Sequence, residues 1–262
     1  MPELPDVEVF RQYFKQTALH QAVTAVAVED ERVLGDVRPE DVSTAAKGRS
    51  FIDARRHGKH LFAQLSDGGW IMFHFGMTGF FKYFKKEEAA PEHPRVIFEF
   101  ENDYRLAWDC QRMIGEVALV ENPETFISEK DLGPDALEIL KEVFLERLAG
   151  KRGMIKTALM DQSLLAGVGN VYSDDILFQC RLHPKTAVGD LSESDRERIF
   201  DAMGNVLQTA ISAKVDPAEM PDRLLTAHRG RDNQCPNCGG ELEKIKVSGR
   251  NGWNCPRCQR PN

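Results

Sequence analysis

The sequence predicts an α+β protein of two domains, with strands in its first half, helices in its second half and a metal-binding hairpin at its C-terminal end. In the first half, short apolar runs are broken by turn residues, as in "FIDARRHGKHLFAQLSDGGWIMFHFGMTGFFKYF" at residues 51–84. In the second half the apolar residues recur with helical spacing, and two C-x2-C pairs close the chain. Strands followed by helices are typical of separate domains, and not of a parallel sheet wound with helices.

The length of 262 residues is enough for two domains, each with a buried core. We place the boundary between them around Val120–Leu132. No apolar run reaches the length of about 18 residues that crosses a membrane. Because no signal peptide follows Met1, we expect a cytoplasmic protein whose thiols stay reduced.

In the first half we expect a helix from Val7 to Leu19 with an aromatic face. "RVIFEFENDYRLAWD" at residues 95–109 reads as a hairpin that turns at 101–103. In the second half, Gly133 opens a predicted helix that runs through Leu148. Further helices are expected at Ile155–Leu164, Asn170–Cys180 and Ser192–Ala213.

The C-terminal cysteines follow the pattern C-x2-C, sixteen residues, C-x2-C, which is the spacing of a tetrahedral zinc site. Four thiolates leave no open position for water, so the zinc would be structural; two disulfides are the alternative. The stretch between the pairs reads as a hairpin, with turn signals on both sides of residues 242–247. Cys110 and Cys180 are isolated, and we interpret them as packing residues. The predicted zinc ligands are Cys235, Cys238, Cys255 and Cys258.

Charge is unevenly distributed along an acidic chain with 34 basic and 41 acidic residues. Residues 222–262 hold eight Lys or Arg against four Asp or Glu, and residues 47–88 hold the same numbers. Residues 121–147 have the opposite balance, with eight acids against three bases. Two basic regions can bind a polyanion while the rest of the surface stays acidic, although an ordinary mixed surface would look similar.

The chain begins "MPELPDVEVF", so removal of Met1 would expose Pro2 as an N-terminal secondary amine. An α-amino group titrates near pH ~8, which leaves a useful fraction neutral and nucleophilic at physiological pH. With an aldehyde carbon this amine would form an iminium, and Glu3 would stand beside it as a proton donor and acceptor. Taken alone, the signal is weak, because proline at position 2 is also innocuous.

Five segments occur together in one order: "PELPDVE" at residues 2–8, "GKHL" at 58–61, "FGMTG" at 75–79, "LMDQSLLAGVGNVYSDDILFQCRLHP" at 159–184, and the cysteine hairpin. In this combination the chain resembles the formamidopyrimidine-DNA glycosylase and endonuclease VIII family of base-excision repair enzymes over almost its full length. The resemblance implies an N-terminal catalytic β-sandwich domain at 1–125. It also implies a DNA-binding domain with a helix–two-turns–helix element at 132–222 and a zinc-finger hairpin at 223–262.

The resemblance further implies a bifunctional DNA glycosylase and abasic-site lyase that excises oxidised bases from double-stranded DNA. Pro2 would attack C1′ while Glu3 protonates the sugar ring oxygen, and β- and δ-elimination would follow. One structural Zn²⁺ is implied, without a redox cofactor or catalytic metal. We expect a monomer that binds no membrane and is associated with the nucleoid when on DNA.

Residue roles follow from the same resemblance. Lys59 and Arg250 match phosphate-binding residues of the family and complete a catalytic set with Pro2 and Glu3. The glycines of "GVGN" would let backbone N–H groups approach a phosphate at the start of a helix. Met77 matches a wedge residue that fills the space left by a flipped base. The predicted DNA-binding residues are Met77, His93, Arg112, Lys156, Asn170 and Tyr172.

Three departures from the family leave the preferred lesion open. In "DCQRMIG", Gln111 and Met113 stand where the formamidopyrimidine enzymes carry an arginine and a phenylalanine. Asp6 replaces the usual glutamate, and residues 213–234 are shorter than a long lesion-capping loop. The alternatives are a preference for oxidised pyrimidines or hydantoins over 8-oxoguanine, or a damaged-DNA-binding protein without catalysis.

Overall fold

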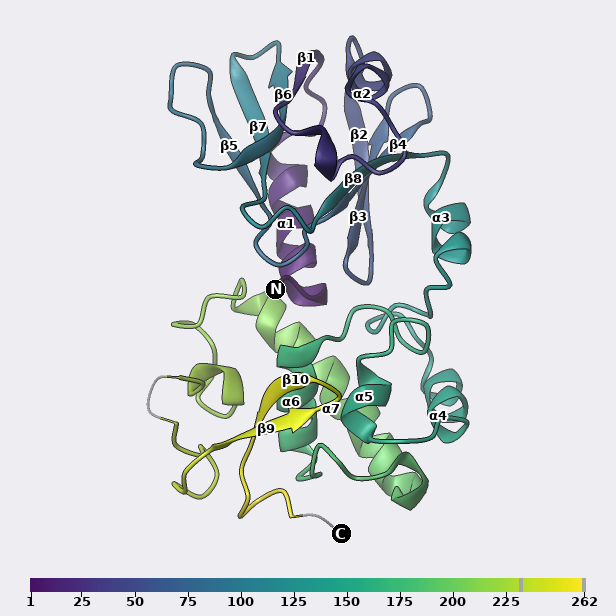
Figure 1. Cartoon of the computed structure of the whole chain (residues 1–262), viewed down its shortest axis with the longest axis vertical. Coiled ribbons are helices and arrows are strands. Elements are labelled where there is room, and N and C mark those ends of the chain that lie inside the picture. The colour runs from purple at the N-terminus through teal and green to yellow at the C-terminus, as the bar shows by residue number, and fades with distance from the viewer. Residues whose placement is uncertain (231–232, 261–262) are drawn as a thin grey trace. The chain divides into compact units, whose positions relative to one another are not determined.

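The computed structural model describes residues 1–230 and 233–260 (Figure 1). The chain divides into two compact units, which are described separately. The first comprises Met1–Pro2 and Val7–Lys130, and the second comprises Glu3–Asp6 and Asp131–Asn262. Within the described ranges no helix is long and apolar enough to span a membrane.

The first unit is built from two four-stranded antiparallel sheets with the orders β1-β6-β7-β5 and β2-β3-β4-β8. Aromatic side chains from both inner faces meet in one core: Phe51 contacts Phe98 and Phe73 contacts Phe81 across the two sheets. The predicted β-sandwich is therefore confirmed, and so is the hairpin at 95–109 with its turn at 101–103. The strands are β1 Val23–Val28, β2 Phe51–His57, β3 His60–Leu65, β4 Trp70–His74, β5 Phe80–Lys85, β6 Pro94–Phe100, β7 Tyr104–Asp109 and β8 Glu116–Val120.

Helix α1, Leu4–Thr17, begins three residues before the predicted start and ends two residues before the predicted end. Proline is tolerated in a first helical turn, so Pro5 does not delay the start. The Asp6 carboxylate also accepts the Glu3 N–H over 2.9 Å, which satisfies a donor at the helix end. The predicted aromatic face is confirmed, because Phe14 packs against Phe51 of one sheet and Phe81 of the other. Two short helices that the sequence analysis did not predict complete this unit, α2 Pro39–Ala46 and α3 Pro123–Glu129, with a 3-10 turn, η1, at Glu31–Val33.

The second unit packs four helices around one apolar core and carries the C-terminal hairpin. The predicted helices at 170–180 and 192–213 are confirmed to within one residue at each end. The hairpin is also confirmed, with Ser248 and Gly249 at its turn. The elements are α4 Lys141–Ala149, α5 Ile155–Leu159, α6 Asn170–Gln179, η2 Val188–Asp190, α7 Glu193–Ser212, η3 Leu225–Ala227, β9 Glu243–Val247 and β10 Arg250–Asn254.

Two helix predictions were too long. The segment after Gly133 pairs with residues 162–166 instead of coiling, since the Gly133 N–H donates to the Gln162 carbonyl over 2.8 Å. Helix α4 therefore starts only at Lys141. Helix α5 ends at Leu159 because Asp161 bonds the backbone N–H two residues on, as Asp often does in turns.

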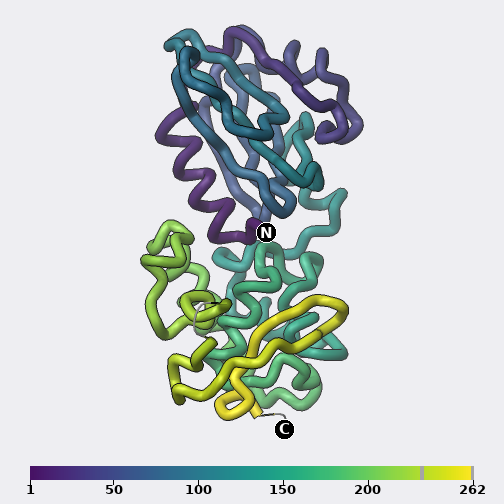
Figure 2. Tube along the Cα trace, turned by 60° about the vertical axis from the view of Figure 1, so that its left-hand side comes forward, coloured from purple at the N-terminus to yellow at the C-terminus, as the bar shows by residue number. Residues whose placement is uncertain are grey.

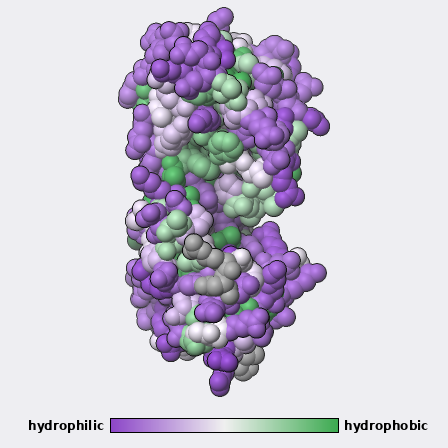
Figure 3. Space-filling view, turned by 90° about the vertical axis from the view of Figure 1, so that its left-hand side faces the viewer, coloured by the Kyte–Doolittle hydropathy of each residue, from purple (hydrophilic) through white to green (hydrophobic). Residues whose placement is uncertain are grey.

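The face drawn in Figure 3 is mostly hydrophilic, with hydrophobic side chains confined to smaller patches. This matches the two apolar cores, which hold most of the large hydrophobic side chains.

Candidate functional site

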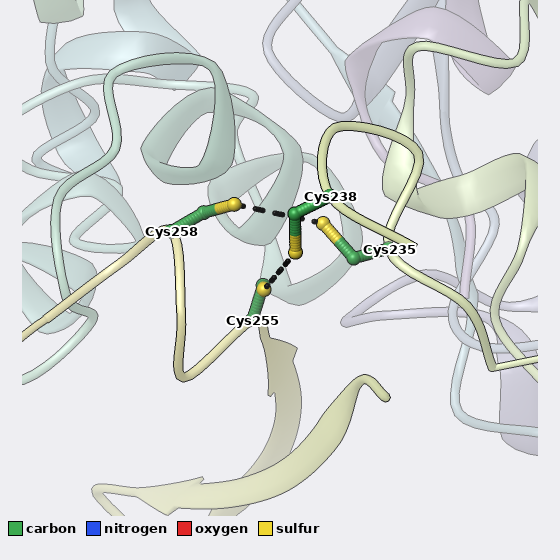
Figure 4. Close-up of side chains that lie close together, drawn as sticks. All are labelled: Cys235, Cys238, Cys255 and Cys258. Atoms are coloured by element: carbon green, nitrogen blue, oxygen red, sulfur yellow. Dashed lines mark hydrogen bonds between the residues drawn. The ribbon is translucent and has the colours of Figure 1, made fainter. Parts of the chain in front are cut away.

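The sulfur atoms of the four C-terminal cysteines point toward one another (Figure 4). The Sγ atoms of Cys235 and Cys258 are 3.8 Å apart, those of Cys238 and Cys255 are 3.6 Å apart, and all four lie within 4.8 Å. Zn–S bonds of about 2.3 Å in a tetrahedron place sulfurs about 3.8 Å apart, whereas a disulfide holds them at about 2.05 Å. The cluster fits one four-thiolate Zn²⁺ ion and does not fit the disulfide alternative. The predicted structural zinc site is confirmed.

Gln259 links the zinc ligands to the helical core. Its buried side chain accepts the Cys255 N–H over 2.9 Å and donates to the Leu182 carbonyl over 2.8 Å. The hairpin also packs Leu242 and Cys255 against Phe178 of α6. The zinc site therefore holds the base of the hairpin and docks it on the second unit. Cys110 and Cys180 are buried in the two cores, as predicted.

Glu3 is buried and closes the N-terminus of α6. Its carboxylate accepts N–H groups from Gly169 at 2.8 Å, Val171 at 2.8 Å and Tyr172 at 3.2 Å. A helix N-terminus favours an anion, so these bonds stabilise the carboxylate in one position. A Cβ on Gly169 would lie 2.3 Å from the Glu3 Cδ, which explains why this position is glycine.

The two glycines of "GVGN" use their own N–H groups within the protein. The Gly169 N–H is bonded to Glu3, and the Gly167 N–H donates to the Gln162 side chain over 3.0 Å. An anion of the protein itself already occupies the helix end. Within the described part of the chain, Asn170 alone among the first-turn residues of α6 has a backbone N–H with no acceptor.

Asp6 and Tyr172 surround this carboxylate. Burial raises the pKa of Asp6 to about 6, and the nearby Glu3 charge adds to the rise, while the hydrogen bond from the Glu3 N–H opposes it. Burial, together with the charges of Asp6 and Glu3, raises the pKa of Tyr172 above its usual range. The site thus holds a neutral phenol and a carboxyl group whose pKa is raised to about 6.

Asn170 and Arg250 come together in the second unit. Asn170 is the first residue of α6, and its side-chain N–H donates to the carbonyl of Asn251 over 2.8 Å. Arg250 precedes Asn251 at the start of β10, is exposed, and lies 3.8 Å from the sulfur of Met160. An exposed guanidinium is suited to a phosphate oxygen.

Lys156 does not have the placement expected of a DNA contact. Its side chain is fully buried, forms an ion pair with Asp174 and donates to the Asn170 carbonyl over 3.0 Å. Arg229 makes a second ion pair with the same carboxylate. A buried ammonium held in this way has no surface left for a phosphate. Tyr172 is likewise buried.

In the first unit, Lys59 lies in the tight turn between β2 and β3. His74 faces His60 across β3 and β4, with ring centroids 5.0 Å apart. Burial lowers the pKa of His74, and the Lys59 charge lowers it further. The lowered pKa favours the neutral imidazole of His74, a residue that the sequence analysis did not select.

Met77 is exposed in the loop between β4 and β5, with 36% of its surface accessible, so it is not a core methionine. The backbone N–H of Arg112 donates to the Thr78 hydroxyl over 3.1 Å, which holds the loop 110–115 against this turn. In that loop Met113 packs on the sandwich core and Ile114 is 52% exposed. Met113, which we matched to the family's phenylalanine, is thus partly buried against the core, whereas its neighbour Ile114 is exposed.

His93 is half-buried just before β6. Its backbone N–H donates to the Asp109 carboxylate over 2.7 Å, and its ring lies 3.9 Å from the Glu92 carboxylate. Pro2 is half-buried and lies two residues before the start of α1.

Comparison with known protein families assigns each part of this chain to a described domain. Residues 1–117 match the formamidopyrimidine-DNA glycosylase N-terminal domain, and residues 132–220 match the H2TH domain of the same enzymes. Residues 234–261 match the zinc finger found in FPG and IleRS. The chain belongs to the formamidopyrimidine-DNA glycosylase family. Members are DNA glycosylases of base excision repair that also cleave at abasic sites, and this chain is one of them.

Curated relatives in the family match from end to end. The formamidopyrimidine-DNA glycosylase of a Synechococcus strain is 34% identical, with 99% of each chain covered. That of Latilactobacillus sakei is 30% identical, with 99% of this chain and 98% of the relative covered.

Solved structures of family members have the same fold. Lactococcus lactis Fpg in complex with DNA containing an abasic site has a TM-score of 0.89 at 25% identity, covering 98% of this chain and 99% of that one. MutM in complex with carbocyclic 8-oxo-G DNA has a TM-score of 0.89 at 26% identity, covering 99% and 100%. The predicted α+β fold with a helix–two-turns–helix domain is confirmed.

Four residues described above were not selected from the sequence of this glycosylase: His74, Ile114, Asp174 and Arg229. One signal was available for Asp174, since "YSDDILF" places two acids in an otherwise apolar helix. None was available for Arg229, which meets Asp174 from a loop 55 residues further along the chain.

Proposed function

We propose that this glycosylase removes oxidised bases through a covalent intermediate on Pro2. Trimming of Met1 makes the Pro2 nitrogen a secondary amine that attacks C1′ of the damaged nucleotide. The observation that carries the proposal is the anchoring of the next residue, Glu3, by three backbone N–H groups. Catalysis depends on fixed geometry, and these bonds hold the carboxylate of the residue that follows the proposed nucleophile in one position.

In this mechanism Glu3 receives the proton that the Pro2 nitrogen loses as the C–N bond forms. It then delivers that proton to the sugar ring oxygen, so that the C1′–O bond of the ring breaks and the ring opens. The glycosidic bond breaks next: the base leaves with the electron pair of that bond and takes a proton from water, and an iminium joins protein to sugar. Loss of a proton from C2′ breaks the C3′–O bond by β-elimination, and δ-elimination then breaks the C5′–O bond. The iminium serves as the electron sink, and a gap remains with phosphate at both ends.

Three further roles belong to the proposal. Lys59 and Arg250 bind phosphates next to the lesion, with His74 beside Lys59. Met77 fills the vacancy of the flipped base, and Ile114, which is exposed where Met113 is partly buried, takes a second wedge position. His93, Arg112 and Asn170 are further candidates for DNA contacts.

The domain limits that we propose are 1–125 for the catalytic β-sandwich, 132–222 for the helix–two-turns–helix domain and 223–262 for the zinc hairpin. We propose that the enzyme acts in the cytoplasm as a monomer and associates with the nucleoid when it is on DNA.

Two variants of this proposal differ in the lesion that the enzyme prefers. Asp6, Gln111 and Ile114 all depart from the 8-oxoguanine pattern, which favours oxidised pyrimidines or hydantoins as good substrates. Excision rates on duplexes with 8-oxoguanine, formamidopyrimidine, thymine glycol and hydantoin distinguish the two. A strong preference for 8-oxoguanine would reject the variant that favours pyrimidines.

The covalent step is tested by borohydride trapping on DNA with an abasic site. Reduction of the iminium should join protein to DNA, and peptide mapping should place the sugar remnant on residue 2. A chain extended before Met1 should not trap, because the proline nitrogen is then an amide. Glu3→Gln should lose base excision while keeping more of the lyase reaction, since an abasic sugar is already partly open. Efficient trapping by the extended chain would reject Pro2 as the nucleophile.

A further inference from the structure

The hairpin is attached to the helices at three places along its length. Figure 2 shows it, in yellow, along the helices of the second unit, and strand β10 contacts α6. Arg250 lies between two of these attachments in the sequence. The attachments are the hydrogen bonds Thr157 Oγ1–Ser248 Oγ at 2.8 Å, Asn170 Nδ2–Asn251 O at 2.8 Å and Trp253 N–Asp174 Oδ2 at 2.9 Å.

Asp174 is the buried centre of this attachment. Its carboxylate is fully inaccessible and accepts hydrogen bonds from Lys156 of α5, from Arg229 beyond η3 and from the Trp253 backbone N–H. Three separate segments of the chain thus converge on one side chain of α6. Since a buried charge without partners is strongly unfavourable, each segment is held in place as long as the carboxylate is charged.

Gly252 shows how closely strand and helix approach. A Cβ at this position would lie 2.7 Å from a carboxylate oxygen of Asp174 and 2.7 Å from the Lys156 ammonium. No side chain fits between β10 and the ion pair. The position of the strand is therefore set directly by the ion pair.

The zinc site by itself does not fix Arg250. The cysteines lie at the base of the hairpin, and Arg250 is five residues before Cys255. At about 3.3 Å per residue this separation is roughly 16 Å along the strand. A two-stranded hairpin anchored only at its base is free to bend at its tip, so a second anchor is needed near Arg250.

We propose that Asp174 is a positioning residue for DNA binding, which holds Arg250 at a fixed spacing from Asn170 so that both reach one stretch of phosphate backbone. This inference rests on the proposed phosphate-binding role of Arg250. Lys156 and Arg229 serve Asp174 and do not touch DNA. The requirement for Asp174 is geometric, because it acts through the backbone of Gly252 and Trp253.

The test uses Asp174→Asn, with Asp175→Asn as the matched control. Asp175 is the next residue, is equally buried, and bonds Thr226 but not the hairpin. Binding to a duplex with a tetrahydrofuran abasic-site analogue is measured across salt concentrations, together with zinc content. Asp174→Asn should keep one zinc per chain, bind about tenfold more weakly and lower the salt slope by about 0.9, the value of one lost phosphate contact. The control should keep the slope.

Trapping on abasic DNA separates positioning from general damage. At saturating DNA the rate of borohydride trapping by Asp174→Asn should equal that of the control, because the chemistry depends on Pro2. If Asp174→Asn does not fold, Gly252→Ala provides the same test with every charge retained. It should show the same weaker binding and lower slope.

A double-mutant cycle with Arg250→Ala decides the inference. If Asp174 acts through Arg250, the double variant should bind no more weakly than Arg250→Ala alone, within about twofold. Additive losses would overturn the inference and leave the phosphate role of Arg250 intact. Arg250→Ala with unchanged affinity and salt slope would overturn both.

Discussion

The carboxylate of Glu3 accepts the backbone N–H of Gly169 over 2.8 Å, across 166 residues of sequence. The residue next to the proposed nucleophile is thus fixed by the N-terminus of α6, the helix that also carries Asn170 and Asp174. Leu4, the residue that follows Glu3, donates its own N–H to the Gly167 carbonyl over 3.1 Å. The same helix therefore organises the proposed acid–base group and the proposed phosphate contacts.

Gly169→Ala should disable base excision. The added Cβ would lie 2.3 Å from the Glu3 Cδ, so the carboxylate must move. A displacement of about 1 Å at a catalytic group lowers the rate about a hundredfold. The measurement is the single-turnover rate on a lesion duplex.

Gly204→Ala is the control for that substitution. A Cβ at Gly204, inside α7, meets no atom within 4 Å. This variant should keep its activity and gain about 0.5–1 kcal/mol of helix stability. An unchanged excision rate in Gly169→Ala would show that the position of Glu3 is not critical.

Asp6→Asn should change the pH dependence of stability. The folded-state pKa of Asp6 is raised from 3.8 to about 6, so the folded protein binds this proton more tightly than the unfolded chain. The resulting stabilisation is present below pH 3.8 and is lost as the pH rises through about 6, by about 3 kcal/mol in total. Asn has no proton to lose. The Tm of the variant, relative to wild type, should therefore rise between pH 4 and pH 7.

Asp161→Asn is the control of opposite sign for this experiment. Burial acts to raise the pKa of Asp161, but hydrogen bonds from Lys151 and Ser163 outweigh it and lower this pKa to about 2. Its stabilisation is present above pH 3.8 and is lost only as the pH falls toward about 2. The Tm difference for Asp161→Asn should stay constant over pH 4–7. A constant difference for Asp6→Asn as well would contradict the raised pKa.

Removal of zinc should abolish DNA binding and leave the β-sandwich folded. The hairpin depends on the metal for its folding, whereas the sandwich has its own aromatic core. Cys238→Ala should give the same result, measured by zinc content, DNA binding and the thermal unfolding of the sandwich. Cys110→Ala, in that core, should keep both zinc and binding. Full activity in metal-free protein would contradict a structural role for the cluster.

Ile114→Ala should slow excision from a lesion duplex by about tenfold or more, because filling an unstacked base step offsets a few kcal/mol. Binding to a duplex that already contains an abasic site should change less. Met113→Ala should instead lower the Tm and keep the excision rate, since Met113 packs on the core. The reverse pattern in these two variants would restore Met113 as the wedge residue.

The sequence by itself determined the features that depend on short stretches of chain. The spacing of the four cysteines specifies a zinc site, because each pair of thiolates is brought together by one tight turn. The helix at Asn170 was predicted to within one residue, since its start and its apolar pattern are local. Pro2 was selected through the resemblance of several short segments to one family, because a proline at position 2 is a weak signal by itself.

Only the tertiary structure decided which polar groups are paired and which are exposed. Lys156 looked like a phosphate contact, yet it is buried because Asp174, Arg229 and Gly252 enclose it from distant segments. The glycine N–H groups of "GVGN" looked free, yet the side chains of Gln162 and Glu3 accept them. Met113 and Ile114 are adjacent in sequence, and only the packing of their loop on the sandwich decides which of them is exposed. In each case the deciding partner is far away in the sequence, so no local pattern could reveal it.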